Sequence, residues 1–214
     1  ITGDSKLICN VHGNDIVPDS ERDIKNKSRS KLVLKYARKV VCPSSYFKDI
    51  LCNEYNINSD KIIIFPSGGV NKDVFHDMDR DECLDKLSLD KNYHYYGMVS
   101  RIEKDKGYDT LLGALQVLLK KNKLKNIKVL YIGTGDEQER FDKLVQEYKL
   151  ENIIIQIKFV NQSTLALYYN AMDLFIFPTR RKSESLGLVG LEAMATSMFV
   201  IGCDLYGPRS YLVN

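Results

Sequence analysis

The sequence predicts an α/β protein built on parallel sheets, and two patterns in its 214 residues support this prediction. Short apolar runs alternate with segments of helical period along the chain, as strands and helices do in parallel sheets covered on both faces. The apolar runs contain few polar residues, which is typical of strands buried on both sides. We therefore expect doubly wound, Rossmann-like parallel sheets.

Each element of this fold follows from one of the two patterns. Eight apolar runs predict strands, at Leu7–Val11, Lys39–Cys42, Ile62–Phe65, Tyr95–Val99, Val129–Ile132, Ile153–Ile157, Leu174–Phe177 and Phe199–Ile201. Helical periodicity between them predicts helices at Ser28–Tyr36, Ser45–Tyr55, Tyr108–Lys121, Gln138–Tyr148, Ser163–Asn170 and Gly187–Ala195.

The alternation breaks once, between Pro66 and Asn92, where a turn is followed by a charged run. This break predicts a partial N-terminal domain at residues 1–75 and a linker at 76–92 with a short helix at Arg80–Leu87. A C-terminal domain is expected at 93–214. Three strands are few for a doubly wound domain, and the chain stops soon after a strand and a turn. We therefore expect both ends to be cut.

Composition narrows the class of protein. Hydrophobic residues make up 44% and charged residues 28%, which is typical of a globular chain rather than a disordered one. A net charge of +3 is too small to indicate nucleic-acid binding. No apolar run approaches the roughly 18–20 residues that span a bilayer. The five cysteines form no C-x-x-C pair, so zinc and disulfide frameworks are not indicated and a reducing cytoplasm is expected.

One segment is strongly basic. Eight basic residues fall between positions 22 and 39: Arg22, Lys25, Lys27, Arg29, Lys31, Lys35, Arg38 and Lys39. A solvated helix face is the favoured interpretation of this segment. The alternative is a peripheral contact with an anionic membrane surface, at the inner face of the membrane.

A candidate anion site lies in the segment Ser183–Ala195, after a predicted strand and a polar loop. Gly187 lets the backbone approach a ligand closely, and a helix that begins there presents free N–H groups to an anion. Glu184 precedes this helix start and Glu192 lies one to two turns inside the helix. The two carboxylates could accept from sugar hydroxyls on either side of a bound diphosphate. The alternative is that Glu184 is a cap-region acid and Glu192 a solvated helix residue.

Five motifs resemble those of the family 4 retaining glycosyltransferases, also called glycosyl transferases group 1, which have the GT-B fold. The glutamates lie in E-S-L-G-L-V-G-L-E-A-M-A at 184–195, which is similar to the family signature with seven residues between two glutamates. The other motifs are P-S-G-G-V-N-K-D-V-F at 66–75, G-M-V-S-R-I-E-K-D-K-G at 97–107, I-G-T-G-D-E at 132–137 and L-Y-Y-N-A-M-D-L-F-I-F-P-T at 167–179.

Arg101 and Lys106 follow a predicted buried strand and precede a helix, where a parallel sheet places its ligand loops. The resemblance implies that these two cations stabilise the charge on the departing nucleoside diphosphate. A fixed cation aimed at developing charge stabilises the transition state more than the ground state. Lys104 is expected to be an ordinary solvated side chain.

The same resemblance implies that residues 1–75 form the acceptor-side domain and residues 93–214 the nucleotide-sugar-binding domain. It also assigns roles to the remaining site residues. Glu184 would accept from hydroxyls of the transferred sugar, and Glu192 from the ribose hydroxyls. The backbone N–H groups of Gly187 and Leu188 would hold the distal phosphate. Gly133 and Gly135 are expected to lie near the nucleoside.

His12 follows the first predicted strand, and two interpretations of it stay open. The family often has a histidine here that faces the sugar and the acceptor. A single histidine at a strand end is also a common structural turn residue.

No metal or other cofactor is expected. Asp77-Met-Asp79 matches the D-x-D pattern that holds Mn²⁺ or Mg²⁺ in the other large glycosyltransferase fold. A metal-binding pair should end a buried strand, whereas this one lies in the charged linker. Helix capping explains it better.

The implied function is transfer of a hexose-type sugar from a UDP-, GDP- or ADP-sugar to an acceptor hydroxyl of a sugar or glycolipid, with retained configuration. Cell-surface polysaccharide or glycolipid synthesis is the expected setting. The alternatives are a non-catalytic nucleotide-sugar-binding module and a nucleotide-sugar epimerase of the same fold. The predicted donor-site residues are expected to converge on one cleft.

Three departures from the family pattern bear on this function. Ser185-Leu186 replaces the commoner Gly-Phe, and Tyr206-Gly-Pro-Arg-Ser210 replaces the usual Gly-Gly-x-Pro-Glu turn. The family's amino-terminal glycine-rich loop is missing, so this fragment is expected to be catalytically incomplete.

Overall fold

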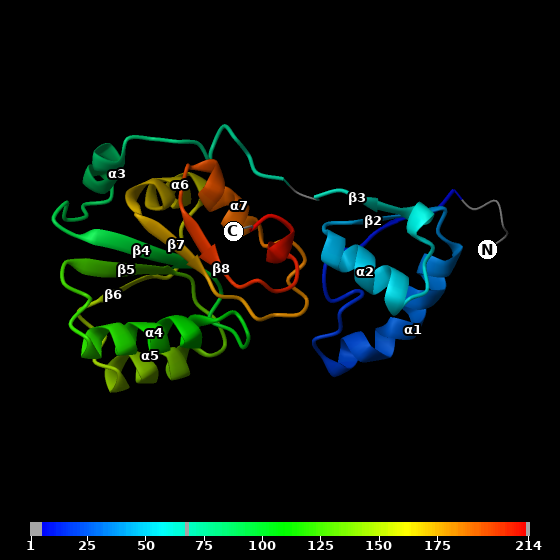
Figure 1. Ribbon diagram of the computed structural model, residues 1–214, viewed down its shortest axis with the longest axis horizontal. Helices are drawn as coiled ribbons and strands as arrows, with labels where there is room; N and C mark the ends of the chain where they lie inside the picture. The colour runs from blue at the N-terminus through cyan, green and yellow to red at the C-terminus, as the bar shows by residue number, and fades with distance from the viewer. Residues whose placement is uncertain (1–5, 67–68, 213–214) are drawn as a thin grey trace. The chain divides into compact units, whose positions relative to one another are not determined.

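The structure is a computed structural model that describes residues 6–66 and 69–212, and it contains two parallel sheets (Figure 1). The smaller sheet has the order β1-β2-β3 and is formed by Ile8–Asn10, Lys39–Cys42 and Ile62–Ile64. The larger has the order β6-β5-β4-β7-β8; its strands, in chain order from β4, are His94–Val99, Ile127–Ile132, Ile154–Ile157, Leu174–Phe177 and Val200–Gly202. Every strand pair is parallel, so the predicted fold class is confirmed.

The contacts of the chain divide it into two compact units. The first contains Ile1–Gly69, Arg181–Gly187 and Asp204–Asn214, and the second contains Val70–Arg180 and Leu188–Cys203. The first unit thus includes two segments that are distant in sequence from its sheet. The predicted domain limits, 1–75, 76–92 and 93–214, divide the chain in sequence order and stay a prediction.

The first unit packs two helices, α1 (Glu21–Tyr36) and α2 (Ser45–Asn53), with its three-stranded sheet. The central strand β2 supplies Val40 and Cys42 to the core, where Leu34 of α1 and Phe47 of α2 are also buried. Helix α1 begins seven residues before the predicted Ser28. Ser20 caps the helix by accepting a 3.2 Å hydrogen bond from the backbone N–H of Asp23. The first turns consist mainly of charged residues and therefore show no apolar residues at helical spacing in the sequence.

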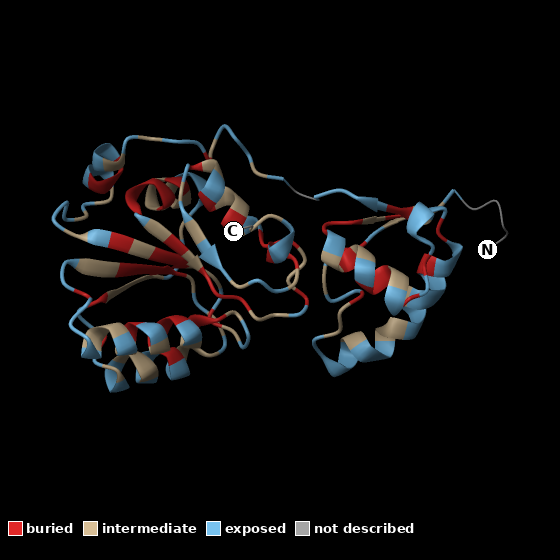
Figure 2. Ribbon diagram, viewed as in Figure 1, coloured by how far each residue is buried: buried red, intermediate tan, exposed pale blue. Residues whose placement is uncertain are grey.

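The second unit is doubly wound. Along β5, Leu130 and Ile132 belong to one core cluster while Val129 and Tyr131 belong to another, as the two-residue period of a strand requires. The first cluster includes residues of α3 (Arg80–Lys86), α6 (Gln162–Ala171) and α7 (Leu188–Ala195). The second includes residues of α4 (Tyr108–Lys120) and α5 (Gln138–Glu147). Buried residues therefore occur along the strands on both faces of this sheet (Figure 2).

Burial on both faces was wrongly predicted for the smaller sheet. Ile8 of β1 is 63% exposed, and both Ile63 and Ile64 of β3 are 46% exposed, although neighbouring residues point to opposite faces of a strand. These two strands lie at the edges of the sheet, and the packing of α1 and α2 buries the central strand β2 instead. Edge strands have fewer neighbours to cover them.

Asn170 connects α6 to the segment that precedes α3. Its amide oxygen accepts a 2.8 Å hydrogen bond from the backbone N–H of Met78. Its amide nitrogen donates to the carbonyl of His76 at 3.1 Å and to that of Ala166 at 2.9 Å. Only 6% of Asn170 is exposed, so these groups are satisfied by the protein rather than by water.

We expect Asn170→Ala to lower the free energy of unfolding by about 2 kcal/mol, because it leaves the part-buried Met78 N–H and the His76 carbonyl without the partner that Asn170 provides. Urea unfolding would measure the loss. Gln146→Ala, at an exposed position of α5, is the control and should stay within about 0.5 kcal/mol of the unchanged chain. Equal losses in the two variants would contradict this account.

Candidate functional site

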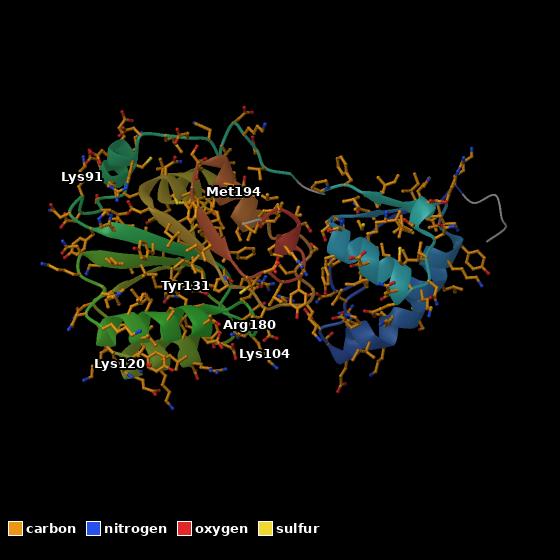
Figure 3. All side chains as sticks on the ribbon, viewed as in Figure 1. Lys91, Lys104, Lys120, Tyr131, Arg180 and Met194 are labelled. Atoms are coloured by element: carbon orange, nitrogen blue, oxygen red, sulfur yellow. The ribbon has the colours of Figure 1, made fainter. Side chains whose placement is uncertain are left out.

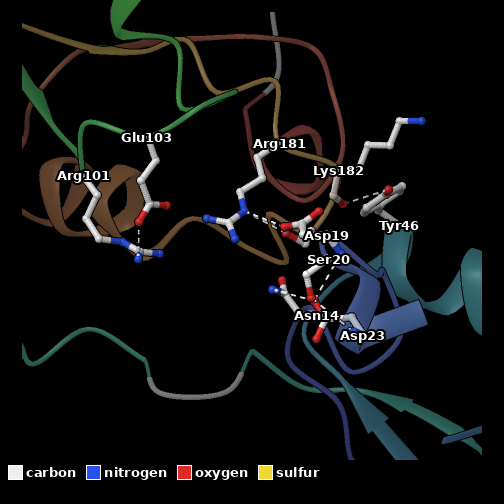
Figure 4. Close-up of polar contacts among 10 residues, drawn as sticks. Asn14, Asp19, Ser20, Asp23, Tyr46, Arg101, Glu103, Arg181 and Lys182 are labelled. Atoms are coloured by element: carbon white, nitrogen blue, oxygen red, sulfur yellow. Dashed lines mark hydrogen bonds and ion pairs between the residues drawn. The ribbon is translucent and has the colours of Figure 1, made fainter. Parts of the chain in front are cut away.

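The loop between β4 and α4 carries Arg101 and Lys106, the two predicted cations. The side chain of Arg101 is 64% exposed and forms an ion pair with the carboxylate of Glu103 (Figure 4). Lys106 is half-buried, and its backbone N–H donates to the Glu103 carbonyl at 3.2 Å. Lys104 is exposed, as its labelled side chain shows (Figure 3). The loop thus presents both cations at the carboxyl end of β4.

Gly133 and Gly135 bring the loop after β5 against the Arg101 loop. A Cβ atom on Gly133 would lie 2.1 Å from the Ser100 carbonyl oxygen, and one on Gly135 would lie 2.3 Å from that of Ile102. Neither distance is compatible with a side chain, and Gly133 also has a φ of 140°. The Ile102 N–H completes the contact by donating to the Thr134 carbonyl at 3.0 Å. The two glycines therefore fix the backbone on both sides of Arg101.

Glu192 is half-buried on α7 and is not the solvated helix residue that one interpretation of the sequence allowed. The Tyr169 hydroxyl lies 3.3 Å from its Oε2 atom and also donates to the Val189 carbonyl at 3.1 Å. Burial raises the pKa of Glu192 above its ordinary value, and the Tyr169 hydroxyl opposes this rise in part.

The segment Arg181–Gly187, which we call the Glu184 loop, belongs to the first unit. The Glu184 carbonyl accepts from the Gly207 N–H at 3.2 Å, and a Cβ atom on Gly207 would lie 2.2 Å from the Ser185 carbonyl oxygen. The Tyr211 hydroxyl donates to the Gly187 carbonyl at 2.9 Å. The turn that departs from the family pattern therefore packs directly against the Glu184 loop.

His12 is exposed in the turn that follows β1. The Asp15 carboxylate accepts from the His12 N–H at 3.1 Å and from the Gly13 N–H at 2.7 Å, so the backbone of His12 takes part in a closed turn. A Cβ atom on Gly13 would lie 3.5 Å from the Ser183 carbonyl oxygen. The turn that contains His12 thus lies beside the Glu184 loop, and its active-site role stays a prediction.

The predicted site residues divide between the two units. His12, Glu184 and Gly187 lie in the first unit. The second contains the others, which are Arg101, Lys106, Gly133, Gly135, Leu188 and Glu192. The convergence of both groups on one donor stays a prediction.

Sequence analysis missed two arginines, Arg180 and Arg181. Arg180 is in the second unit, where its Nη2 atom lies 2.9 Å from both carboxylate oxygens of Asp109. Arg181 is in the first unit, where its Nε atom donates to Asp19 at 2.8 Å (Figure 4). Their partners lie 71 and 162 residues away in sequence, so no local spacing could have indicated either pair.

Asp79 acts as a helix cap. Its carboxylate accepts from the Glu82 N–H at 2.9 Å at the start of α3, as capping predicts. Within residues 6–66 and 69–212, no group of three or more His, Cys, Asp and Glu side chains is arranged to hold a metal ion. In the same described part of the chain, no helix combines the length and the apolar character needed to cross a membrane.

Residues 79–214 match the model of the family described as "Glycosyl transferases group 1". The chain belongs to this family. The match spans more than half of the chain and contains all of the predicted site residues except His12.

Two curated relatives agree with this membership, and one solved structure shares the fold. The capsular polysaccharide biosynthesis glycosyltransferase CapM of Staphylococcus aureus is 28% identical over 192 residues, which are 86% of this chain and 48% of CapM. The alpha-monoglucosyldiacylglycerol synthase of Streptococcus pneumoniae is 27% identical over 166 residues, 76% of this chain and 36% of the synthase. The chain therefore spans half or less of the length of these two group 1 relatives.

The solved structure is that of HepE from Anabaena in complex with UDP and glucose. It has a TM-score of 0.81 at 16% identity, and the alignment covers 97% of this chain and 55% of HepE. At this identity the likeness shows the fold alone, which is of the GT-B type predicted for group 1 glycosyltransferases.

We expect Glu192→Gln to stabilise the chain at pH 7.5 and to lose this advantage as the pH falls. When folding raises the pKa of a carboxyl group, the protonated group stabilises the folded state, and this contribution is complete at pH values below the pKa of the unfolded chain. The contribution is lost as the pH rises through the pKa of the folded chain. The neutral amide cannot ionise and therefore escapes that loss. Urea unfolding at pH 7.5 and at acidic pH would measure the difference, and a glutamine variant that is less stable at pH 7.5 would contradict the burial effect.

Proposed function

We propose that this chain carries most of the donor-binding half of a retaining glycosyltransferase that needs no metal ion. It would transfer a hexose-type sugar from a nucleotide-diphosphate sugar to an acceptor hydroxyl. The observation that carries this proposal is the family match over residues 79–214, since that range contains both glutamates of the signature and both cations of the β4–α4 loop. The residues that the sequence resemblance assigns to donor binding, His12 apart, thus lie inside the range that matches the family.

In the proposed reaction, the bond between the anomeric carbon and the phosphate oxygen breaks while the acceptor oxygen bonds to the same face of the sugar. The proton of the acceptor hydroxyl passes to the departing phosphate. Arg101 and Lys106 would stabilise the negative charge that gathers on this phosphate. Support for these roles comes from the two glycine contacts that fix the backbone on both sides of Arg101, because a fixed backbone limits the positions that the cation can take.

The two glutamates would bind hydroxyls of the donor. Glu192 would accept from the ribose, and its half-buried position beside Tyr169 supports a functional role, because carboxylates with raised pKa values are concentrated at functional sites. Glu184 would accept from the transferred sugar. The N–H groups of Gly187 and Leu188, at the start of α7, would bind the distal phosphate.

The acceptor is proposed to be a sugar or a glycolipid in cell-surface polysaccharide or glycolipid synthesis in the cytoplasm. The names of CapM and of the alpha-monoglucosyldiacylglycerol synthase support this setting. Peripheral membrane contact through α1 is part of the same proposal. Residues 21–39 contain eight basic and two acidic side chains, a charge of +6 in a chain of net +3, and Ile24, Leu32 and Tyr36 are exposed among them.

We expect Arg101→Ala to weaken the binding of a nucleoside diphosphate about ten-fold or more, because a charge-assisted hydrogen bond contributes about 1.5–3 kcal/mol. Calorimetry with UDP, GDP and ADP in the presence of EDTA would measure the loss for the nucleotide that binds. Lys104→Ala is the matched control, since Lys104 is an exposed cation of the same loop and should leave the affinity unchanged. Equal losses at the two positions, or binding that EDTA abolishes, would end this assignment.

We expect Glu184→Gln to leave the affinity for the free nucleoside diphosphate unchanged and to weaken binding of the corresponding sugar nucleotide. Its proposed partner is the transferred sugar, which the free diphosphate lacks. Glu192→Ala should weaken both ligands alike, because its proposed partner is the ribose. Calorimetry with each pair of ligands distinguishes the two patterns, and a Glu184 variant that loses the free diphosphate would contradict the proposed role.

A further inference from the structure

The Glu184 loop is held in the first unit by residues from near both ends of the chain. Figure 4 shows Arg181 directed toward Asp19, and Lys182 beside Tyr46. Gly207 and Tyr211 bond the same loop from the C-terminal side, through the Glu184 and Gly187 carbonyls. A seven-residue segment with no helix or strand of its own therefore takes its shape from these contacts.

Asp19 makes the charged contact with this loop. Its Oδ2 atom accepts from the Arg181 Nε atom at 2.8 Å and from the hydroxyl of Ser183. The Arg181 Nε atom is also 2.9 Å from the Ser183 Oγ atom, so the three side chains form a closed group. The side chains of Arg181 and Asp19 are only 20% and 28% exposed, and Ser183 is buried. Asp19 as a whole residue is exposed, and its bond to the buried Ser183 distinguishes this pair from isolated surface ion pairs, which contribute little to stability.

The position of Asp19 is itself fixed by the start of α1. The next residue, Ser20, caps that helix, and the Asp19 N–H lies 3.4 Å from the carboxylate of Asp23. The carboxylate that meets Arg181 is thus attached to the end of a helix rather than to a free loop. A constrained partner loses less conformational entropy when it forms an ion pair.

Tyr46 holds the loop at the neighbouring residue. Its hydroxyl, in the first turn of α2, donates to the Lys182 carbonyl at 3.0 Å, and its ring lies 5.3 Å from that of Tyr206. Burial raises the pKa of Tyr46 to about 12, so the hydroxyl keeps its proton and remains a donor at neutral pH. Residues 181, 182 and 183 are therefore all bonded to the N-terminal segment, immediately before Glu184.

We propose that Asp19 is a positioning residue for the donor sugar. By binding Arg181 and Ser183, it fixes the backbone from which Glu184 extends and so sets where the Glu184 carboxylate meets the transferred sugar. This inference rests on the proposed function of Glu184. It adds that a residue of the N-terminal segment, outside the family match and outside the five motifs, determines the geometry of the sugar contact.

The test uses Asp19→Asn, which keeps the shape of the side chain and removes its charge. Asp49→Asn is the control, because Asp49 is an exposed carboxylate on α2 of the same unit. Two quantities are measured on the full chain after thermal melting has shown that each variant folds. The first is the rate of tryptic cleavage after Lys182, followed by mass spectrometry. The second is the ratio of the affinity for UDP-glucose to the affinity for UDP. If the chain binds GDP or ADP instead of UDP, the ratio is measured with GDP-mannose and GDP, or with ADP-glucose and ADP.

We expect Asp19→Asn to speed cleavage after Lys182 about ten-fold and to reduce the affinity ratio of sugar nucleotide to nucleotide about five-fold, with Asp49→Asn unchanged in both. Arg181→Gln should have similar effects, and the double variant should be little worse than either single variant, because both substitutions break one interaction.

Two outcomes would overturn the role of Asp19 alone. One is cleavage that does not change, and the other is faster cleavage with an unchanged affinity ratio. A different result would overturn the proposed function. If the chain without any substitution binds none of the three sugar nucleotides, that function is wrong, whatever the cleavage rates are.

Discussion

The larger sheet depends on the register of β4 between β5 and β7, where Val99 is paired with Ile132 and Gly97 with Phe175. Because these strands are parallel, their carboxyl ends lie at one edge of the sheet, and the loops that follow them are neighbours. Contact between two such loops requires that one of them have no side chains at the point of approach. Gly133 and Gly135 meet this requirement against Ser100 and Ile102. The strand pairing thus determines where the Arg101 loop lies, and the glycines determine its shape.

The Glu184 loop takes its shape from side-chain contacts rather than from strand pairing. It has no regular secondary structure, and its shape comes from polar contacts with Asp19 and Tyr46 on one side and with Gly207 and Tyr211 on the other. The segment that carries the signature glutamate is therefore stabilised by parts of the chain that are not in the motif. This explains how the turn after β8 can depart from the family sequence and still support the loop, since the close approach at Gly207 is kept.

Glu192 is a half-buried carboxylate that reduces the stability of the fold. Burial disfavours its charged form, and the hydrogen bond from Tyr169 offsets that effect only in part. A carboxylate in such a place lowers stability near neutral pH. Asn170, on the same helix as Tyr169, stabilises the fold instead. Each polar group of its side chain forms hydrogen bonds with the backbone.

The sequence by itself determined the strand and helix order, the parallel α/β class and the family, because local periodicity and contiguous motifs record these features. It placed β2 and β7 at their exact limits and identified the loop that carries Arg101. Only the tertiary structure decided that Ile8 of β1 and both Ile63 and Ile64 of β3 are exposed, that Glu192 is half-buried and that Arg181 pairs with Asp19. Each of these depends on residues far apart in sequence that the fold brings together, and no local pattern records which side chains will become neighbours.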